Sequence, residues 1–396
     1  MPTFFKTNIF RQSIIALSFD LGGLLSGSVA AYYYPLFGNL VWILLLFTPI
    51  LTIRGNIGGI YSGKLGTMLH LGLAKPSLFK NTREFYSLIK AILALTFFDT
   101  LVIGIISFAL NSSFGLISLQ HLPYFILVPP FTCLLAILIS IPIASIVGIE
   151  VFKRGLDPDI FIYPVMSTLD DILITFCYFT IAGFIIYFDN LPLLFLILIL
   201  VAVYFSAIVL RYRRDNVFRR TLLEGVPTVV LASLFGVFGG MGLGSLKEKI
   251  EDMPSILIIY PALIDALGDI GSILGSMETT KLALGYTTSL TKTFKETLAD
   301  LVSVECAAAI IHLTFATIGF AISGLQNISF LFYLISITLF SNIISFLFIS
   351  IFSLTVATQT FKYGLDPDNF VIPLVASVSD VVATLSLAAS MGIFFI

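Results

Sequence analysis

Apolar segments long enough to cross a lipid bilayer recur along the whole chain, and no other feature constrains the fold as strongly. A helix of about 20 apolar residues spans the hydrocarbon core of a membrane. We count eleven such segments, near residues 13–34, 40–72, 85–110, 122–149, 158–188, 191–210, 221–245, 254–285, 297–323, 329–360 and 366–395. Because backbone groups in lipid must be hydrogen-bonded within their own segment, these segments predict an all-α polytopic membrane protein.

The composition leaves no room for a large soluble domain. Of the 396 residues, 58% are hydrophobic and 11% are charged, whereas soluble domains contain about 25% charged residues. The first apolar segment is too long for a signal peptide and lacks a small-residue cleavage site, so we interpret it as the first span. Segments 40–72 and 254–285 are unusually long and rich in glycine, and we expect each to be broken or strongly tilted.

The distribution of lysine and arginine predicts the orientation. If the N-terminus is cytoplasmic, nearly all basic loops fall on the cytoplasmic side, including the run from Arg211 to Arg220. The opposite loops that carry no lysine or arginine are 111–121, 189–190 and 324–328. Only Lys247 and Lys249 break the rule. We therefore expect a multi-pass protein of the cell membrane with a cytoplasmic N-terminus and an external C-terminus.

Two halves of the chain repeat the same motifs in the same order. One motif occurs as Gly55-Asn56-Ile57-Gly58 and again as Gly268-Asp269-Ile270-Gly271. A Gly-Leu-Asp-Pro-Asp motif occurs at 155–159 and again at 364–368. Each copy precedes a proline and then an aspartate, Asp171 or Asp380. A coincidence at this length is improbable, so we infer an internal repeat.

We expect each repeat to be one five-helix unit, with residues 1–188 as the first and 221–396 as the second. The linker 189–220 contains one further span and a basic loop. A five-helix unit has its ends on opposite sides of the membrane, so the extra span returns the chain to the side where the first repeat began. The repeats are then parallel and related by a pseudo-two-fold axis along the membrane normal. An ion site between the two repeats, on that axis, would be lined by the same helices of both.

Charged side chains inside a membrane are rare and usually functional, and here most of them are acids. Asp171 and Asp380 are the strongest candidates, since each lies about 21 Å along a helix that begins at an Asp-Pro pair. Two symmetry-related carboxylates facing one axis would form an oxygen site for a divalent cation. Mg²⁺ suits such a site because it keeps several waters and needs only one or two carboxylates. The alternative is a protonated aspartic acid hydrogen-bonded between helices.

Four further residues belong to the predicted metal site. Asn56 and Asp269 place an oxygen-bearing side chain at the same position of each repeat, and Asp265 lies one turn before Asp269. Asp170 is secondary because its counterpart is Ser379. The glycines around Asn56 and Asp269 permit close helix approach, and for most of them packing alone is a sufficient explanation.

Several other residues carry less weight. Arg54 is the chief basic residue at the depth of the acids, and we expect it to neutralise a nearby carboxylate. Asp99, Glu305 and His312 are candidate pathway residues without an acidic match in the other repeat. The three cysteines sit alone in apolar segments and are interpreted as small hydrophobic residues. The sequence has no nucleotide-binding loop, catalytic triad or zinc-ligand pattern, so we expect neither an enzyme nor a nucleic-acid partner.

These motifs resemble the MgtE-type family of magnesium channels and transporters. The stretch 49–67, with its Gly55-Asn56 pair, is similar to the Gly-Asn segment of that family. Segments 157–171 and 366–380 look like the last MgtE helix, with its Asp-Pro start, internal proline and pore aspartate. The presence of two such domains in one chain resembles the eukaryotic solute-carrier magnesium transporters most closely.

The resemblance implies Mg²⁺ as the transported ion, Asp171 and Asp380 as ion-binding aspartates and Asn56 as the conserved asparagine of the family. It also implies that a single chain does what an MgtE homodimer does. The second repeat departs from the family in having Asp269 in place of the asparagine. The sequence shows no counterpart of the cytoplasmic Mg²⁺-sensing domains of bacterial MgtE, so gating through them is not implied.

Three classes of function are compatible with these features. A divalent cation channel or transporter in the lipid bilayer accounts for the repeated deep carboxylates. A secondary transporter of another substrate, coupled to Na⁺ or H⁺, would use the same carboxylates for its coupling ion. A membrane scaffold that transports nothing is the third class, and the repeated carboxylates count against it because a scaffold does not need them.

Overall fold

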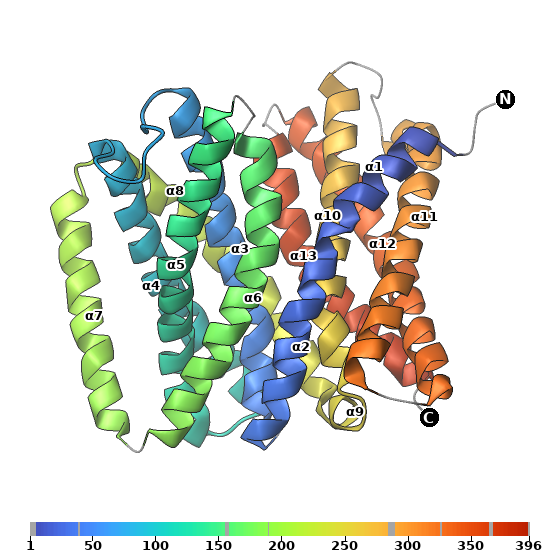
Figure 1. The fold of residues 1–396 in the computed structure, drawn as a ribbon, viewed down its shortest axis with the longest axis horizontal. Helices are drawn as coiled ribbons and strands as arrows, with labels where there is room; N and C mark the ends of the chain where they lie inside the picture. The colour runs from blue at the N-terminus through green and yellow to red at the C-terminus, as the bar shows by residue number, and fades with distance from the viewer. Residues whose placement is uncertain are drawn as a thin grey trace. The chain divides into compact units, whose positions relative to one another are not determined.

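The computed structural model is all-helical over the residues it describes, which are 5–38, 40–154, 158–188, 190–283, 290–324, 327–363 and 367–394. The helices are α1 (Thr7–Leu17), α2 (Gly23–Tyr33), α3 (Val41–His70), α4 (Arg83–Ser113), α5 (Leu122–Lys153), α6 (Pro158–Tyr187), α7 (Leu191–Tyr212), α8 (Asn216–Ser245), α9 (Lys247–Asp252), α10 (Ser255–Ala283), α11 (Leu290–Ser323), α12 (Ile328–Lys362) and α13 (Pro367–Phe394) (Figure 1). Short 3₁₀ turns occur at Phe19–Gly22, Tyr34–Phe37 and Leu119–His121.

Eleven spans in the described residues are long and apolar enough to cross a membrane, which confirms the predicted number. The first span, Thr7–Phe37, consists of α1 and α2 with their 3₁₀ turns. Helix α9 is too short to span a bilayer. The prediction of an all-α polytopic membrane protein is therefore confirmed.

Segments 40–72 and 254–285 were expected to be broken or strongly tilted; the break does not occur in their described residues, and the tilt stays a prediction. Helices α3 and α10 are continuous, although Pro49 and Pro261 lie inside them. Each proline removes a single backbone hydrogen bond near the start of a long helix, and the remaining hydrogen bonds keep the helix intact. The interruption occurs instead at Phe19–Gly22 in the first span. Serine, aspartate and glycine are poor helix formers, and residues 18–23 contain all three.

The chain divides into two compact units. The first unit comprises residues 33–241, and the second unit comprises residues 1–32 together with 242–396. The first unit thus contains α3–α7 and most of α8, while the second contains α1, most of α2, and α9–α13. The helices that open the first predicted repeat, α1 and α2, therefore belong with α10–α13 of the second repeat. Helix α8, which opens the second repeat, belongs with α3–α6 of the first. The division into repeats at 1–188 and 221–396 stays a prediction about the sequence.

In the first unit, α8 crosses α3 through two glycines. A Cβ atom on Gly240 would overlap the carbonyl oxygen of Leu45, and one on Gly236 would lie 2.7 Å from the hydroxyl oxygen of Thr52. Pro49 has no N–H to offer the carbonyl of Leu45, which lies four residues before it. The glycine lets α8 approach this carbonyl at a distance that any larger residue would prevent.

The second unit contains the same crossing between α2 and α10. A Cβ atom on Gly27 would overlap the carbonyl oxygen of Ile258, and one on Gly23 would lie 2.5 Å from the backbone nitrogen of Ala262. Gly23 and Gly27 correspond to Gly236 and Gly240 at the same sequence offset that relates Asn56 to Asp269. The two units therefore share one way of packing a glycine-bearing helix against a long, proline-containing helix.

The start of each crossing helix is also tied to a neighbour, with opposite polarity in the two units. In the first unit, Asp215 at the start of α8 accepts a hydrogen bond of 2.7 Å from Ser87 and lies 3.6 Å from Arg83, both on α4. In the second unit, the tie is at the start of α1, which precedes the crossing helix α2 in the same span, where Lys6 forms a 2.5 Å ion pair with Asp300 on α11. An acid fixes the span with the crossing helix in one unit, and a base fixes it in the other.

Candidate functional site

The first unit holds a buried cluster of charges between α3 and α6. Nη2 of Arg54 lies 2.7 Å from Oδ1 of Asp171 and donates a 2.8 Å hydrogen bond to the carbonyl oxygen of Ser167. Nη1 of Arg54 lies 3.7 Å from Oδ2 of Asp170. None of these three charged side chains is more than 7% exposed. The expectation that Arg54 neutralises a nearby carboxylate is confirmed.

Glycine brings the carboxylate of Asp170 against α3. A Cβ atom on Gly58 would lie 3.4 Å from Oδ2 of Asp170, so a larger residue there would crowd the carboxylate. Asn56, on the same part of α3, is half-buried, and its Nδ2 atom has no hydrogen-bond partner among the described residues. A buried ion pair costs desolvation free energy, and this cluster sets two carboxyl groups against one guanidinium.

The corresponding acids of the second unit lie on α10 and α13, and these two helices pack against each other. Asp265 and Asp269 are one turn apart on α10, Asp380 lies on α13, and all three are half-buried. The two helices are tied together near Asp380 by a 2.8 Å hydrogen bond between the hydroxyls of Tyr260 and Thr384. The unit thus places three carboxylates on one pair of packed helices.

The second unit lacks the arginine of the first. The residue that corresponds to Arg54 is Leu267, which is fully buried. Helix α13 contains no lysine or arginine, and the only one in α10 is Lys281 in its last turn. Lys281 lies 2.7 Å from Asp300, about 18 Å along α10 from Asp269. No basic residue of these two helices therefore stands at the level of Asp265 and Asp269.

The structure brings some of the predicted site residues together and leaves other predictions open. Asp170 and Asp171 share Arg54, while Asp265, Asp269 and Asp380 share one helix pair. The proposed helix starts Asp157 and Asp366, and the side chains of the prolines at 158, 164, 367 and 373, lie outside the described residues. Within the described ranges, no three His, Cys, Asp or Glu side chains are grouped as a metal would require. That Asp171 and Asp380 face each other stays a prediction.

The weaker candidates are placed as follows. Asn342 donates a 2.9 Å hydrogen bond to Oε1 of Glu305, and Nδ1 of His312 lies 2.8 Å from the carbonyl oxygen of Ala308 in its own helix. Asp99 is completely buried, and neither of its carboxylate oxygens has a hydrogen-bond partner in the described part of the chain. In the described residues Nε2 of His312 has no hydrogen-bond partner either, so His312 and Asp99 both stay candidate pathway residues.

One polar cluster was missed by sequence reasoning. Lys281 contacts Asp300 at 2.7 Å and Glu278 at 4.0 Å, and Thr297 donates a 3.3 Å hydrogen bond to Glu278. The spacing of Glu278 and Lys281 on one helix face is a recognisable ion-pair signal, but the part played by Asp300 depends on how α11 packs.

Repeated acids inside the spans of a polytopic α-helical membrane protein are typical of proteins that move ions. A family model described as MgtE, divalent cation transporter, matches residues 47–181 and 260–390. The chain belongs to this family, which is one of transporters and not of enzymes. The matched segments run from α3 to α6 and from α10 to α13, in agreement with the internal repeat. No curated protein and no solved structure matches the chain.

Proposed function

We propose that the protein moves Mg²⁺ across the membrane as a channel or transporter. The observation that carries the proposal is that Asp265, Asp269 and Asp380 lie within the spans on α10 and α13, two helices that pack against each other. Carboxylate oxygens are the ligands that Mg²⁺ prefers, and the ion needs only a few of them because it keeps part of its water shell. Three acids on one helix pair supply that chemistry.

The first unit takes part through Asp171, with Asp170 and Asn56 as its neighbours. The guanidinium of Arg54 already lies on Asp171, so an arriving divalent ion competes with a tethered cation for the same carboxylate. The six proposed metal ligands are Asp171, Asp380, Asn56, Asp269, Asp265 and Asp170, and we place their ion site between the two sequence repeats. We propose that those on α10 and α13 bind the ion most strongly and that Asp171 does so only when Arg54 releases it.

Within the family, we propose the two-domain, single-chain form found in the eukaryotic solute-carrier magnesium transporters as the nearest relative. Both family segments lie in one chain, so one chain would hold all six proposed ligands. We also propose that the N-terminus faces the cytoplasm of a cell membrane and that the C-terminus lies outside. A tag after residue 396 that is accessible only from the cytoplasm would contradict this orientation.

A transporter coupled to Na⁺ or H⁺, with another substrate, is the second candidate. The observation that favours it is the complete burial of Asp99, a carboxyl without a hydrogen-bond partner in the described residues. A buried acid that forms no structural hydrogen bond is suited to exchanging a proton or a small cation during transport.

Ion flux into proteoliposomes distinguishes the two candidates. Uptake of Mg²⁺, Mn²⁺, Co²⁺ and Ca²⁺ would be measured with and without a Na⁺ gradient and with and without a pH gradient. Mg²⁺ uptake driven by its own gradient alone supports a channel, and uptake that requires the second gradient supports an exchanger. Absence of divalent flux under every condition, with the protein folded, would refute the proposed substrate.

A further inference from the structure

A basic cavity lies in the first unit, where α4 begins and α7 ends. Its volume is about 580 Å³, and small-molecule sites commonly measure about 300–1,000 Å³. Its lining includes four basic side chains together with Tyr212 and Asp215, and the four are Arg83, Lys90, Arg211 and Arg214. Four positive charges and one negative charge favour a ligand that carries more than one negative charge.

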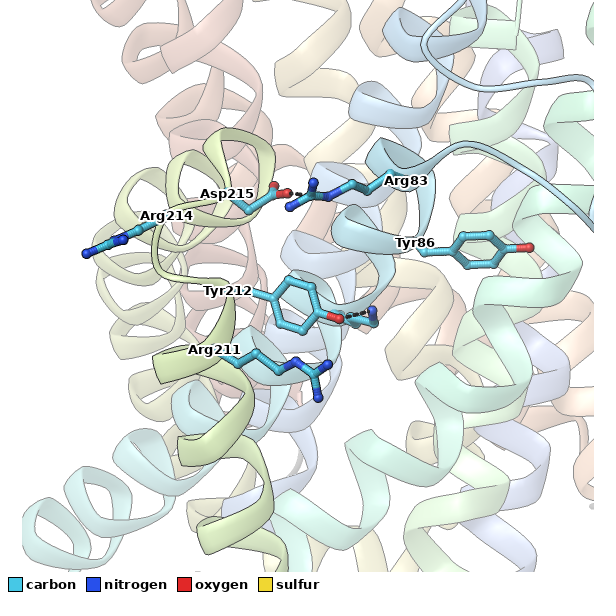
Figure 2. A pocket seen from close by; sticks show the side chains of 7 residues that line it. Arg83, Tyr86, Arg211, Tyr212, Arg214 and Asp215 are labelled. Atoms are coloured by element: carbon cyan, nitrogen blue, oxygen red, sulfur yellow. Dashed lines mark hydrogen bonds and ion pairs between the residues drawn. The ribbon is translucent and has the colours of Figure 1, made fainter.

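Two of the four basic groups are already engaged within the cavity, as Figure 2 shows. Arg83 lies 3.6 Å from Oδ2 of Asp215, and Lys90 donates a 2.6 Å hydrogen bond to the hydroxyl of Tyr212. Among the described residues, no ion pair or hydrogen bond engages the guanidinium of Arg211 or Arg214. In Figure 2 the guanidinium of Arg211 lies near Tyr212, whereas that of Arg214 points away from the other labelled side chains. Both guanidinium groups are left for a ligand, and the planar fork of each matches the oxygens of a phosphate group.

Helix α7, which supplies Arg211 and leads into the turn that carries Arg214, is the least buried of the described spans. In the most apolar stretch of each span, 17% of the residues of α7 are buried, compared with 72% in α3 and 78% in α10. Tyr204 and Leu210 are 62% and 66% exposed just before Arg211 in the sequence. Tyr204 lies two turns before Arg211 on the same face of the helix, so an exposed apolar surface leads directly to the cavity.

We propose that this cavity binds the phosphorylated headgroup of an anionic phospholipid, with the acyl chains lying along α7. A soluble phosphate compound could use the arginines, but it would gain nothing from the exposed apolar face of α7. The cavity lies at the end of α7 that the basic loops predict to be cytoplasmic, the side of a membrane where anionic lipids concentrate. Basic pockets at the ends of spans are suited to headgroups with several charges.

Native mass spectrometry of the full chain in detergent tests the proposal. The probes are phosphatidylinositol 4,5-bisphosphate, phosphatidylserine and soluble inositol 1,4,5-trisphosphate. The variant Arg211→Gln/Arg214→Gln removes the two unengaged guanidinium groups. The matched control Arg219→Gln/Arg220→Gln removes two charges from the same basic run, outside the cavity lining. Melting of each variant without lipid shows whether it folds.

We expect the parent to retain the bisphosphorylated lipid more than phosphatidylserine or the soluble trisphosphate. The Arg211→Gln/Arg214→Gln variant should lose about thirtyfold in affinity, and the control should stay within about threefold of the parent. Equal losses in both variants would overturn the proposal in favour of a diffuse basic surface. Equal affinity for the soluble trisphosphate would overturn it in favour of a soluble anion. If the first variant does not fold, Arg211→Lys, which keeps the charge but not the fork, should still bind less lipid than the parent, and unchanged binding would contradict the proposal.

Discussion

In the first unit Arg54 lies against Asp171 at 2.7 Å, whereas in the second unit the corresponding position is the buried Leu267. Acids lie on α6 of the first unit, as Asp170 and Asp171, and on α13 of the second, as Asp380. Helix α10 also carries Asp265 and Asp269, whereas α3 has no acid and places Asn56 where α10 has Asp269. The glycine crossings of α8 on α3 and of α2 on α10 are alike. The two units thus share their packing and differ in the charge that balances their acids.

We infer from this difference that the two units kept their packing while the residues around the proposed ion ligands diverged. A tethered guanidinium stabilises a carboxylate in the absence of metal but competes with a metal for it. Neighbouring carboxylates repel one another, and a divalent ion between them removes that repulsion. We therefore expect the first unit to supply stability and the second unit to supply most of the affinity for the cation.

The largest effect is expected from Arg54→Leu, which gives the first unit the residue of the second. Removing one partner of a buried ion pair costs about 3–5 kcal/mol, because the remaining carboxylate is left uncompensated. Added Mg²⁺ should restore part of this loss, since an ion that binds only the folded state stabilises it. Thermal melting in detergent, with and without Mg²⁺, measures both effects.

Lys64→Leu on the same helix is the matched control for Arg54→Leu. Lys64 lies 3.6 Å from Glu224, and that carboxylate side chain is 64% exposed. Surface pairs of this kind contribute about 1 kcal/mol or less. If Arg54→Leu melts like the parent without Mg²⁺, the carboxylate of Asp171 does not depend on the guanidinium, and the comparison between the units fails.

The next effect concerns ion flux. Asp380→Asn removes a charged ligand from the second unit, and we expect divalent flux to fall by roughly a hundredfold, as about 3 kcal/mol implies. Asp171→Asn should reduce flux less than Asp380→Asn, and Asp170→Asn should reduce it least. Proteoliposome uptake of Mg²⁺ measures all three. If the double variant Asp171→Asn/Asp380→Asn transports Mg²⁺ at the parent rate, these aspartates are not the ion site.

A smaller and equal effect is expected from the two glycine crossings. Gly240→Ala and Gly27→Ala each place a methyl group against a backbone carbonyl, so the helices must separate, at a cost of about 1–3 kcal/mol. Gly63→Ala is the control, because a Cβ atom there meets nothing within 4 Å, and alanine is the better helix former. If thermal melting shows unequal losses of stability for Gly27→Ala and Gly240→Ala, the two crossings do not contribute equally to stability.

Much of the fold could be predicted from the sequence because hydropathy sums over some 20 residues, which averages out local exceptions. The eleven spans and the repeat followed from this and from recurring motifs. The break at Phe19–Gly22 was missed because a long apolar run masked its poor helix formers. The exchange of opening helices between the units was also missed, since a repeat shows which residues pack but not which copy they pack against.

The candidate site was predictable in part. The pairing of Arg54 with an acid followed from its position as the chief base at that depth. The difference between the units was visible as Arg54 and Leu267, but its meaning required the observed contact with Asp171. The cavity at α7 could not be foreseen, because the Arg211–Arg220 run has the appearance of an orientation signal until α4 is placed beside it.

The smallest effect is expected outside the membrane, at the acid that ties α8 to α4 in the first unit. Burial raises the pKa of Asp215, but hydrogen bonds from Ser87 and Phe218 and the charge of Arg83 outweigh it and hold the pKa below its usual range. A carboxyl with a depressed pKa stabilises the fold above its unfolded pKa of about 3.9, and this stabilisation is lost as pH falls through the folded value.

Asp215→Ala should therefore cost about 1 kcal/mol at pH 7 and at pH 5, the usual size of a lost helix cap. The difference from the parent should shrink below about pH 4. Melting across this range, with the exposed Asp252→Ala as control, measures it. A loss that is equal at pH 7 and pH 3 would mean that the charge of Asp215 is not what fixes α8, and the opposite polarity of the two helix anchors would then carry no energetic meaning.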